Sequence, residues 1–382
     1  MKIGIMTLWW SNDNYGQILQ CYALQKYLRD RGHDAFLIRY KPENLKHLSS
    51  AQKLCFAIKH PFETISILSS KMKPVPILSE TEKKNNIMRG FDSFRAKYII
   101  TTGIVYESYH SLCDNPPEAD MYIVGSDQIW NINNEYADES INTWFLKFVP
   151  NKSKRASYAA SFGRDNLSKS MKKLIKPLLE DFSNVTVREN SGKNIAKSIG
   201  INAHVVCDPT LLLSKEQYYS LFSMITVPNK KYVFLYLLSN TCTFSVHKLE
   251  KWAKKNKLEL IYVSGNAGWK HCNYDDEGIK KSYLTIPEWL SCLANAEYVI
   301  TNSFHCSLFS LLFEKKIAVV PLEGSVKNTN NRIDSLFFNL HVQKKEIKNN
   351  NFEILRKLNF QKIDMQFIEN SKKILNSFGD GL

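Results

Sequence analysis

Residues 3–40 read IGIMTLWWSNDNYGQILQCYALQKYLRDRGHDAFLIRY, and this stretch carries the clearest fold signal in the chain. The apolar run from Ile3 to Leu8 predicts a buried strand, and the residues from Gly16 onward predict a helix with one apolar side. Gly32 fits the end of that helix, and Ala35 to Tyr40 predicts a second strand. A strand, a helix and a strand in this order form the unit from which parallel sheets are built, so the chain begins as a Rossmann-like α/β fold.

The second half of the chain repeats this alternation of short apolar runs and amphipathic stretches. Further strands are predicted at 121–124, 155–161, 185–187, 232–238, 259–263, 298–301 and 317–320, with helices at 167–180, 244–255, 287–295 and 303–314. A length of 382 residues also favours two domains. We therefore predict an α/β protein with two Rossmann-like domains whose parallel sheets face a central cleft. The predicted parts are an N-terminal domain at 1–205 with a helical insertion at about 41–100, a C-terminal domain at 206–350, and a C-terminal helix at 351–382 that packs back near the junction.

Charge and cysteine usage restrict the class of protein. The formal net charge is +14, which favours anionic partners such as nucleic acid, phosphorylated small molecules or an anionic membrane face, although genome base composition is another source of lysine. The basic and apolar stretch 45–73 would also suit a membrane-surface helix, but packing against the domain is the commoner outcome. Eight cysteines without a Cys-x-x-Cys pair indicate reduced thiols, and no apolar run reaches the ~18 residues that cross a bilayer. We expect a cytoplasmic protein, with a peripheral contact at the inner membrane face left open.

Ligands of open parallel sheets bind beyond the carboxyl ends of the strands, so polar residues directly after strands are the candidate site. The segment 298–313, YVITNSFHCSLFSLLF, passes from a buried strand through Asn302, Ser303 and His305 into an apolar helix. A helix start beside a hydroxyl and an imidazole suits a phosphate group. The alternative is that Ser303 only caps the helix and that His305 lies in the wall of the cleft.

Two arginines are candidate cations for an anionic ligand. Arg188 follows the predicted strand at 185–187, and its guanidinium could hold a carboxylate or phosphate by two parallel hydrogen bonds. The alternative is a surface pair with Glu189 or Asp181. Arg332 opens a predicted helix after the last strand, where the alternative is an ordinary pair with Asp334.

A third group of strand-end residues suits a sugar. In GSDQIWN at 125–131, Asp127 is placed as a general base, and Ser126 and Trp130 could bind hydroxyls and stack on a sugar ring. The alternative is that Asp127 caps a helix and that Trp130 lies in the core. Other strand-end residues that we predict to face the same cleft are Asn14, Tyr15, Gly16 and Ser161.

Seven stretches in order resemble the polysaccharide pyruvyltransferase family. They are NYGQILQCYALQKYLRDRGH at 14–33, VGSDQIWN at 124–131, YAASFG at 158–163, VTVREN at 185–190, VCDPTLLL at 206–213, VITNSFHCSLFSLLF at 299–313 and NNRIDSLF at 330–337. The resemblance implies two Rossmann-type domains in the manner of GT-B glycosyltransferases, and transfer of pyruvate from phosphoenolpyruvate to a sugar as a ketal. The family usually has glycine after the histidine of its Ser-Phe-His motif, where this chain has Cys306.

The resemblance also implies roles for the candidate residues. His305 would be the acid near the donor and Asp127 a base near the acceptor. The donor would be bound by Arg188, Asn302, Ser303, His305 and Arg332, and the acceptor by Asn14, Tyr15, Gly16, Ser126, Asp127, Trp130 and Ser161.

The expected partners are phosphoenolpyruvate and a saccharide of a bacterial capsule or exopolysaccharide, free or lipid-linked. No cofactor, no metal and no nucleic acid are expected. Two other interpretations stay open: a GT-B glycosyltransferase that uses a nucleotide sugar, and a non-catalytic binder of an anionic polymer.

Overall fold

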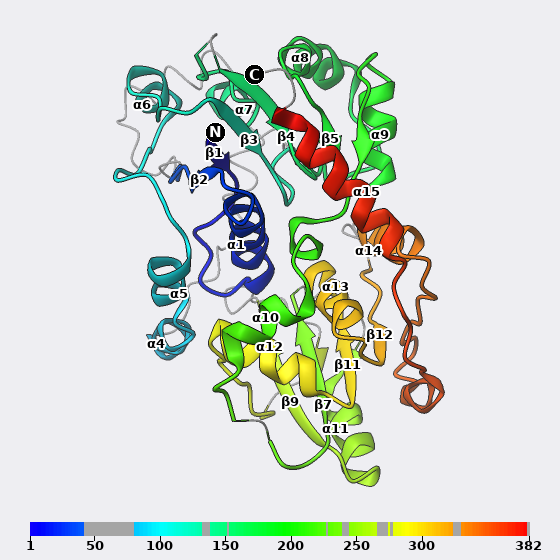
Figure 1. Cartoon of the computed structure of the whole chain (residues 1–382). Coiled ribbons are helices and arrows are strands. Elements are labelled where there is room, and N and C mark those ends of the chain that lie inside the picture. The colour runs from blue at the N-terminus through cyan, green and yellow to red at the C-terminus, as the bar shows by residue number, and fades with distance from the viewer. Residues whose placement is uncertain are drawn as a thin grey trace, which may run out of the picture.

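The computed structural model describes residues 1–41, 80–131, 138–150, 153–226, 228–238, 244–265, 274–275, 278–323 and 330–379. Two parallel sheets of four strands each form the centres of two lobes (Figure 1). The N-terminal lobe has the order β2-β1-β3-β4, and the C-terminal lobe has the order β12-β11-β7-β9. The predicted fold class, α/β with two Rossmann-like parallel sheets in the GT-B manner, is confirmed by this arrangement.

The strands follow the predicted apolar runs closely. Their bounds are β1 (Lys2–Met6), β2 (Asp34–Leu37), β3 (Met121–Val124), β4 (Lys154–Ser157), β7 (Tyr232–Leu237), β9 (Glu259–Ser264), β11 (Tyr298–Thr301) and β12 (Ile317–Val319). Two further parallel pairs lie outside these sheets: β5 (Thr186–Val187) with β6 (His204–Val205), and β8 (Phe244–Ser245) with β10 (Tyr274–Asp275). Every strand of the two large sheets pairs in parallel, so the residues after the strands gather at one edge of each sheet.

Helices cover the sheets and connect the strands. Their bounds are α1 (Tyr15–Arg29), α4 (Glu80–Met88), α5 (Phe91–Tyr98), α6 (Tyr109–Asp114), α7 (Asp138–Trp144), α8 (Lys169–Glu180), α9 (Asn190–Lys197), α10 (Lys215–Phe222), α11 (Val246–Lys255), α12 (Ile286–Asn295), α13 (Phe304–Leu312), α14 (Asn330–Asn339) and α15 (Met365–Asn376). The Asn14 side chain caps α1 by accepting from the Gln17 N–H, and Gly32 follows that helix with a left-handed φ of 82°. No helix among the described residues has the length and apolar character needed to span a bilayer.

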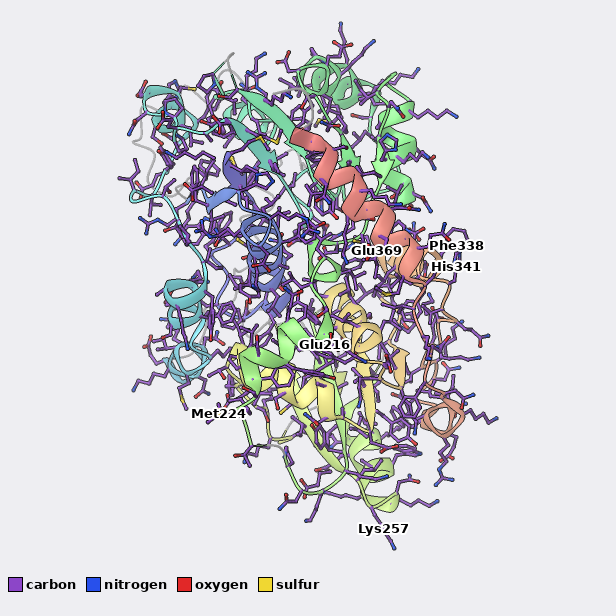
Figure 2. All side chains as sticks on the ribbon, in the orientation of Figure 1. Glu216, Met224, Lys257, Phe338, His341 and Glu369 are labelled. Atoms are coloured by element: carbon purple, nitrogen blue, oxygen red, sulfur yellow. The ribbon has the colours of Figure 1, made fainter. Side chains whose placement is uncertain are left out.

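The two lobes share an apolar core. One cluster of buried side chains includes Ile18 and Tyr15 of α1 together with Trp289 of α12 and Phe304 of α13. The rings of Tyr15 and Trp289 stack with centroids 5.0 Å apart, and the Tyr15 hydroxyl donates to the Leu284 carbonyl at 2.6 Å. Side chains fill the space between the sheets in Figure 2, whereas Met224 and Phe338 project from the rim, 92% and 69% exposed.

Two segments outside the sheets also join the lobes. Arg89, between α4 and α5, is buried and donates to the Tyr15 hydroxyl at 3.1 Å and to the Ser264 carbonyl at the end of β9 at 2.7 Å. The remainder of the predicted insertion, residues 42–79 with the stretch 45–73, lies outside the described residues. Helix α15 returns to the N-terminal lobe, where the Ser371 hydroxyl accepts from the Cys207 N–H at 2.9 Å (Figure 1).

Candidate functional site

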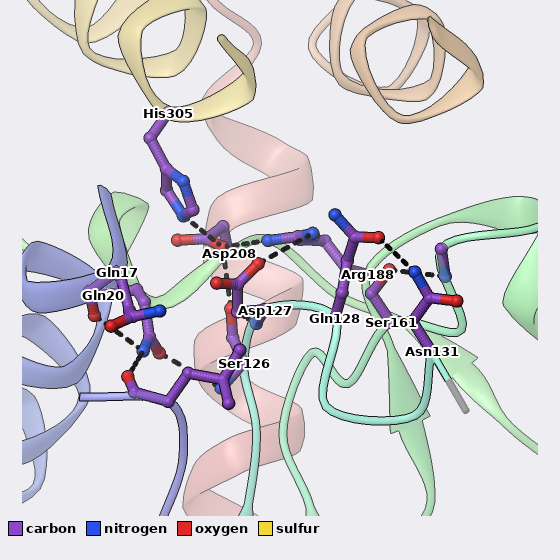
Figure 3. A network of polar contacts seen from close by, with 12 residues as sticks. Gln17, Gln20, Ser126, Asp127, Gln128, Asn131, Ser161, Arg188, Asp208 and His305 are labelled. Carbon is purple, nitrogen blue, oxygen red and sulfur yellow. Dashed lines mark hydrogen bonds and ion pairs between the residues drawn. The ribbon is translucent and has the colours of Figure 1, made fainter. Parts of the chain in front are cut away.

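Asp208 is the centre of a polar cluster between the lobes (Figure 3). It follows β6, and its Oδ2 accepts from the Ser126 hydroxyl at 2.8 Å and from Arg188 Nη1 at 3.1 Å. The same oxygen lies 3.4 Å from Nε2 of His305, which belongs to the C-terminal lobe. Its other oxygen accepts from the backbone N–H and the hydroxyl of Thr210. The segments that follow β3, β5, β6 and β11 therefore bring their polar groups together at one carboxylate.

The ionised form of the Asp208 carboxyl group is stabilised by its neighbours. Burial alone raises the pKa of this carboxyl group, but the His305 imidazolium and the Arg188 guanidinium outweigh burial and hold the pKa well below its usual range. Asp208 is therefore ionised across the neutral pH range, and it places a negative charge beside the His305 ring.

Arg188 neutralises several acids rather than facing an open anion site. Its guanidinium lies 3.1 Å from Asp208, 3.6 Å from Glu189 and 3.8 Å from Asp127, and it also covers the Phe304 ring at 4.2 Å. Burial lowers the pKa of Arg188, but the three carboxylates outweigh burial and raise it. Three carboxylates, of Asp127, Glu189 and Asp208, therefore share this site with the cationic side chains.

Arg332 approaches from the first turn of α14 in the C-terminal lobe. With the Gln128 amide turned so that its oxygen faces the guanidinium, that oxygen accepts from Arg332 Nη1 at 2.7 Å. The alternative pair with Asp334 does not form, since Asp334 binds Lys344. Burial and the nearby Arg188 lower the pKa of Arg332 to about 10, so this group stays cationic at neutral pH with little compensation by carboxylates.

His305 is placed by the start of α13. Ser303 caps this helix by accepting from the Cys306 N–H at 3.3 Å, and Asn302 accepts from the Leu238 N–H at 2.8 Å. These two side chains therefore hold the strand-to-helix turn, and their contact with a donor stays a prediction. The Cys306 side chain is fully buried in the shared core, where burial raises the pKa of its thiol to about 12, so this departure from the family motif adds no charge to the site.

Several hydrogen-bonding atoms of the cluster are buried and have no hydrogen-bond partner within the described part of the chain. They are Nε and Nη2 of Arg188, Oε2 of Glu189, Nε2 of His305 and Nε of Arg332. Buried polar groups in proteins are nearly always satisfied, and an unsatisfied set in one place is typical of a site that receives a ligand. Four of these five atoms are nitrogens that can donate, so the cluster suits a ligand rich in acceptor oxygens.

The structure corrects part of the predicted acceptor side. Trp130 does not stack on a sugar, because it is fully buried, its ring stacks on Phe145 and its indole N–H donates to the Trp144 carbonyl. Tyr15 is likewise fully buried in the stack with Trp289.

The remaining acceptor candidates lie in or beside the cluster. The hydroxyls of Ser126 and Ser161 are buried and hold Asp208 and Glu189, the latter at 2.6 Å. Asn14 caps α1, Gly16 contacts His305, and Asp127 keeps 8% of its surface exposed. Their contact with an acceptor stays a prediction.

Sequence reasoning did not single out Asp208, Glu189 or Gln128. The available signal for Asp208 was its place in the VCDPTLLL stretch, which matches the family. Its local sequence indicates only the end of a strand before a proline. Within the described ranges, no group of three or more histidine, cysteine, aspartate or glutamate side chains is arranged to hold a metal ion.

A family model described as polysaccharide pyruvyl transferase matches residues 14–322, which include α1, Asp127, Arg188, Asp208 and His305. The chain belongs to this family. It is therefore a transferase, and the matched residues include most of the polar cluster but not Arg332.

Comparison with solved structures gives more distant likenesses. The UDP-GlcNAc 2-epimerase of Methanocaldococcus jannaschii, in complex with UDP-GlcNAc and UDP, has 14% identity and a TM-score of 0.48, and the match covers 98% of this chain and 99% of that chain. MurG of Acinetobacter baumannii has 10% identity and a TM-score of 0.42, with 97% and 94% coverage. No curated protein matches the sequence.

Proposed function

We propose that this pyruvyl transferase takes its pyruvyl group from phosphoenolpyruvate and attaches it to two hydroxyls of a saccharide as a ketal, with release of inorganic phosphate. The observation that carries the proposal is the set of unpartnered donors on Arg188, Arg332 and His305. Phosphoenolpyruvate presents a phosphate and a carboxylate, and their oxygens are acceptors for such donors.

Each group has a proposed part in the reaction. His305 donates a proton to the methylene carbon of the enol, which becomes a methyl group, while the first sugar hydroxyl adds to the central carbon and gives its proton to Asp127. The second hydroxyl then displaces phosphate from the same carbon, and its proton leaves with the phosphate. Proton transfer of this kind requires an acid and a base that act on opposite reactants.

Arg332 is the proposed main contact for the donor. Arg188 already faces three carboxylates, whereas the partner of Arg332 is the neutral amide of Gln128. An incoming anion therefore gains more from Arg332, because no carboxylate competes for it at hydrogen-bonding distance.

Arg332→Gln is expected to raise the KM for phosphoenolpyruvate about 10- to 100-fold, the effect of losing one charge-assisted contact, with a smaller change in kcat. Steady-state phosphate release at varied phosphoenolpyruvate measures it. Arg356→Gln, which changes an exposed arginine bound to Glu353, is the matched control. An unchanged KM in Arg332→Gln would remove this residue from the donor site.

The reaction itself is tested with a panel of acceptors. The protein is incubated with phosphoenolpyruvate and with free and lipid-linked oligosaccharides, and both released phosphate and the mass gain of each acceptor are followed. A parallel series replaces phosphoenolpyruvate with nucleotide sugars. Glycosyl transfer without pyruvyl transfer, or neither product with any acceptor, would contradict the proposal.

A further inference from the structure

Gly16 stands in the first turn of α1, where its own backbone does not require glycine. Its φ is not in the left-handed region, and glycine is less favourable than alanine inside a helix. A Cβ atom at this position would lie 2.2 Å from Nδ1, 2.3 Å from Cγ and 2.5 Å from Cβ of His305. Real Cβ atoms do not approach ring atoms so closely, so the missing side chain is what makes room for the imidazole.

Asp208 lies on the other side of the same ring. His305 points toward Asp208 in Figure 3, with Nε2 and Oδ2 3.4 Å apart, but this contact lacks hydrogen-bond geometry. Ser126 and Arg188 hold the carboxylate from the N-terminal lobe. The ring is thus confined by Gly16 of the N-terminal lobe and by Asp208, whose carboxylate is held by two residues of that lobe.

A few segments contribute the charged side chains that surround His305. Asp208 faces it directly, Arg188 shares that carboxylate, and Asp127 and Glu189 face Arg188. Arg332 of α14 carries a positive charge beside Arg188. Helix α1 contributes the uncharged Gly16, Gln17 and Gln20 on its side of the cluster (Figure 3). The one charge in direct contact with the imidazole is therefore negative.

We propose that Gly16 and Asp208 are positioning residues for His305. They form a socket that receives the imidazole of the C-terminal lobe, Gly16 by leaving space and Asp208 by fixing the ring with its carboxylate. This inference rests on the proposed role of His305 as the acid. With this socket, His305 can act as the acid only when the two lobes are in contact.

Gly16→Ala tests whether the space that glycine leaves for His305 is needed. We expect kcat to fall about 100-fold, as for a misplaced reacting group, while the KM for phosphoenolpyruvate stays near its wild-type value. The thermal midpoint is expected to fall somewhat, because the Cβ atom of His305 would lie 2.5 Å from the added methyl group and cannot rotate away from it. Gly103→Ala is the matched control, since a Cβ there meets nothing within 4 Å. Wild-type kcat in Gly16→Ala would overturn the proposal.

A double-mutant cycle separates positioning from general damage. The variant that combines Gly16→Ala with His305→Gly is expected to be no slower than His305→Gly alone, because glycine at position 305 removes both the ring and the Cβ atom that the new methyl group would meet. Additive losses would show that Gly16 acts on something else.

Asp208→Asn tests the charge with an isosteric side chain. Without the carboxylate the ring loses the charged group that fixes it, so kcat should fall about 10- to 100-fold with little change in the KM for phosphoenolpyruvate. Asp208→Glu, which restores the charge, should recover part of kcat. Wild-type kcat in folded Asp208→Asn would overturn the role of the charge.

A readout without substrate distinguishes this inference from the proposed reaction. In ¹H–¹⁵N spectra of histidine rings, the His305 signal is assigned by its loss in His305→Gln. It should shift in Gly16→Ala and in Asp208→Asn but not in Gly103→Ala. Such shifts in a protein that shows no pyruvyl transfer would support the socket and reject the proposed reaction. Unshifted signals would reject the socket whatever the activity.

Discussion

Replacing His305 by alanine is expected to lower pyruvyl transfer by about 10²- to 10⁴-fold, the contribution of a positioned general acid. The imidazole of the C-terminal lobe lies against Asp208, and its Nε2 has no hydrogen-bond partner among the described residues. Removal of the ring therefore removes the proposed proton donor. Phosphate release and acceptor mass gain measure the effect at saturating phosphoenolpyruvate.

The matched control is His341→Ala. His341 is an exposed histidine that pairs with Asp364 at 2.8 Å near the end of α14, at the rim of the molecule (Figure 2). This variant should retain wild-type turnover. Near-normal turnover in His305→Ala would remove His305 from the chemistry, and an equal loss in both variants would point to damage unrelated to the site.

Arg188→Ala is expected to lower the free energy of unfolding by about 3–5 kcal/mol, the usual result of removing one partner of a buried ion pair. The guanidinium lies between Asp127, Glu189 and Asp208, and without it three buried carboxylates face one another. Denaturant unfolding followed by circular dichroism measures the change. Activity should also be lost, but through the disordered cluster rather than through one missing contact to the donor.

The destabilisation caused by Arg188→Ala is also expected to depend on pH. The penalty in Arg188→Ala arises from charged carboxylates, so it should shrink as the pH approaches the ordinary carboxyl range near 4, where the acids take up protons. Arg356→Ala, an exposed pair with Glu353, should change the free energy of unfolding little at any pH. A destabilisation of Arg188→Ala that does not vary with pH would contradict the electrostatic explanation.

The fold was largely predictable because hydrophobic periodicity is a local property. Buried parallel strands are short apolar runs, and two of them, at 121–124 and 298–301, have the predicted bounds. The placement of candidate residues after strands was predictable for the same reason, since parallel pairing brings all carboxyl ends to one edge. Arg188, Asp127, His305 and Arg332 do gather there.

Local sequence does not show which residues each charged side chain pairs with in the folded protein. Arg188 reads as a free cation for a phosphate until Asp208, twenty residues further along the chain, is seen beside it. Trp130 and Tyr15 read as exposed aromatic side chains near a sugar, but tertiary packing places both in the core. Gly16 reads as a helix start, and its contact with His305 joins positions that are far apart in the sequence.

The aromatic stack of Tyr15 on Trp289, with Arg89 hydrogen-bonded beside it, bears on attempts to recombine this enzyme. A chimera that takes one lobe from a relative inherits half of a closely packed interface, together with half of the surroundings of its imidazole. Exchange of acceptor preference between relatives is therefore better attempted by grafting single strand-end loops than by swapping halves of the chain.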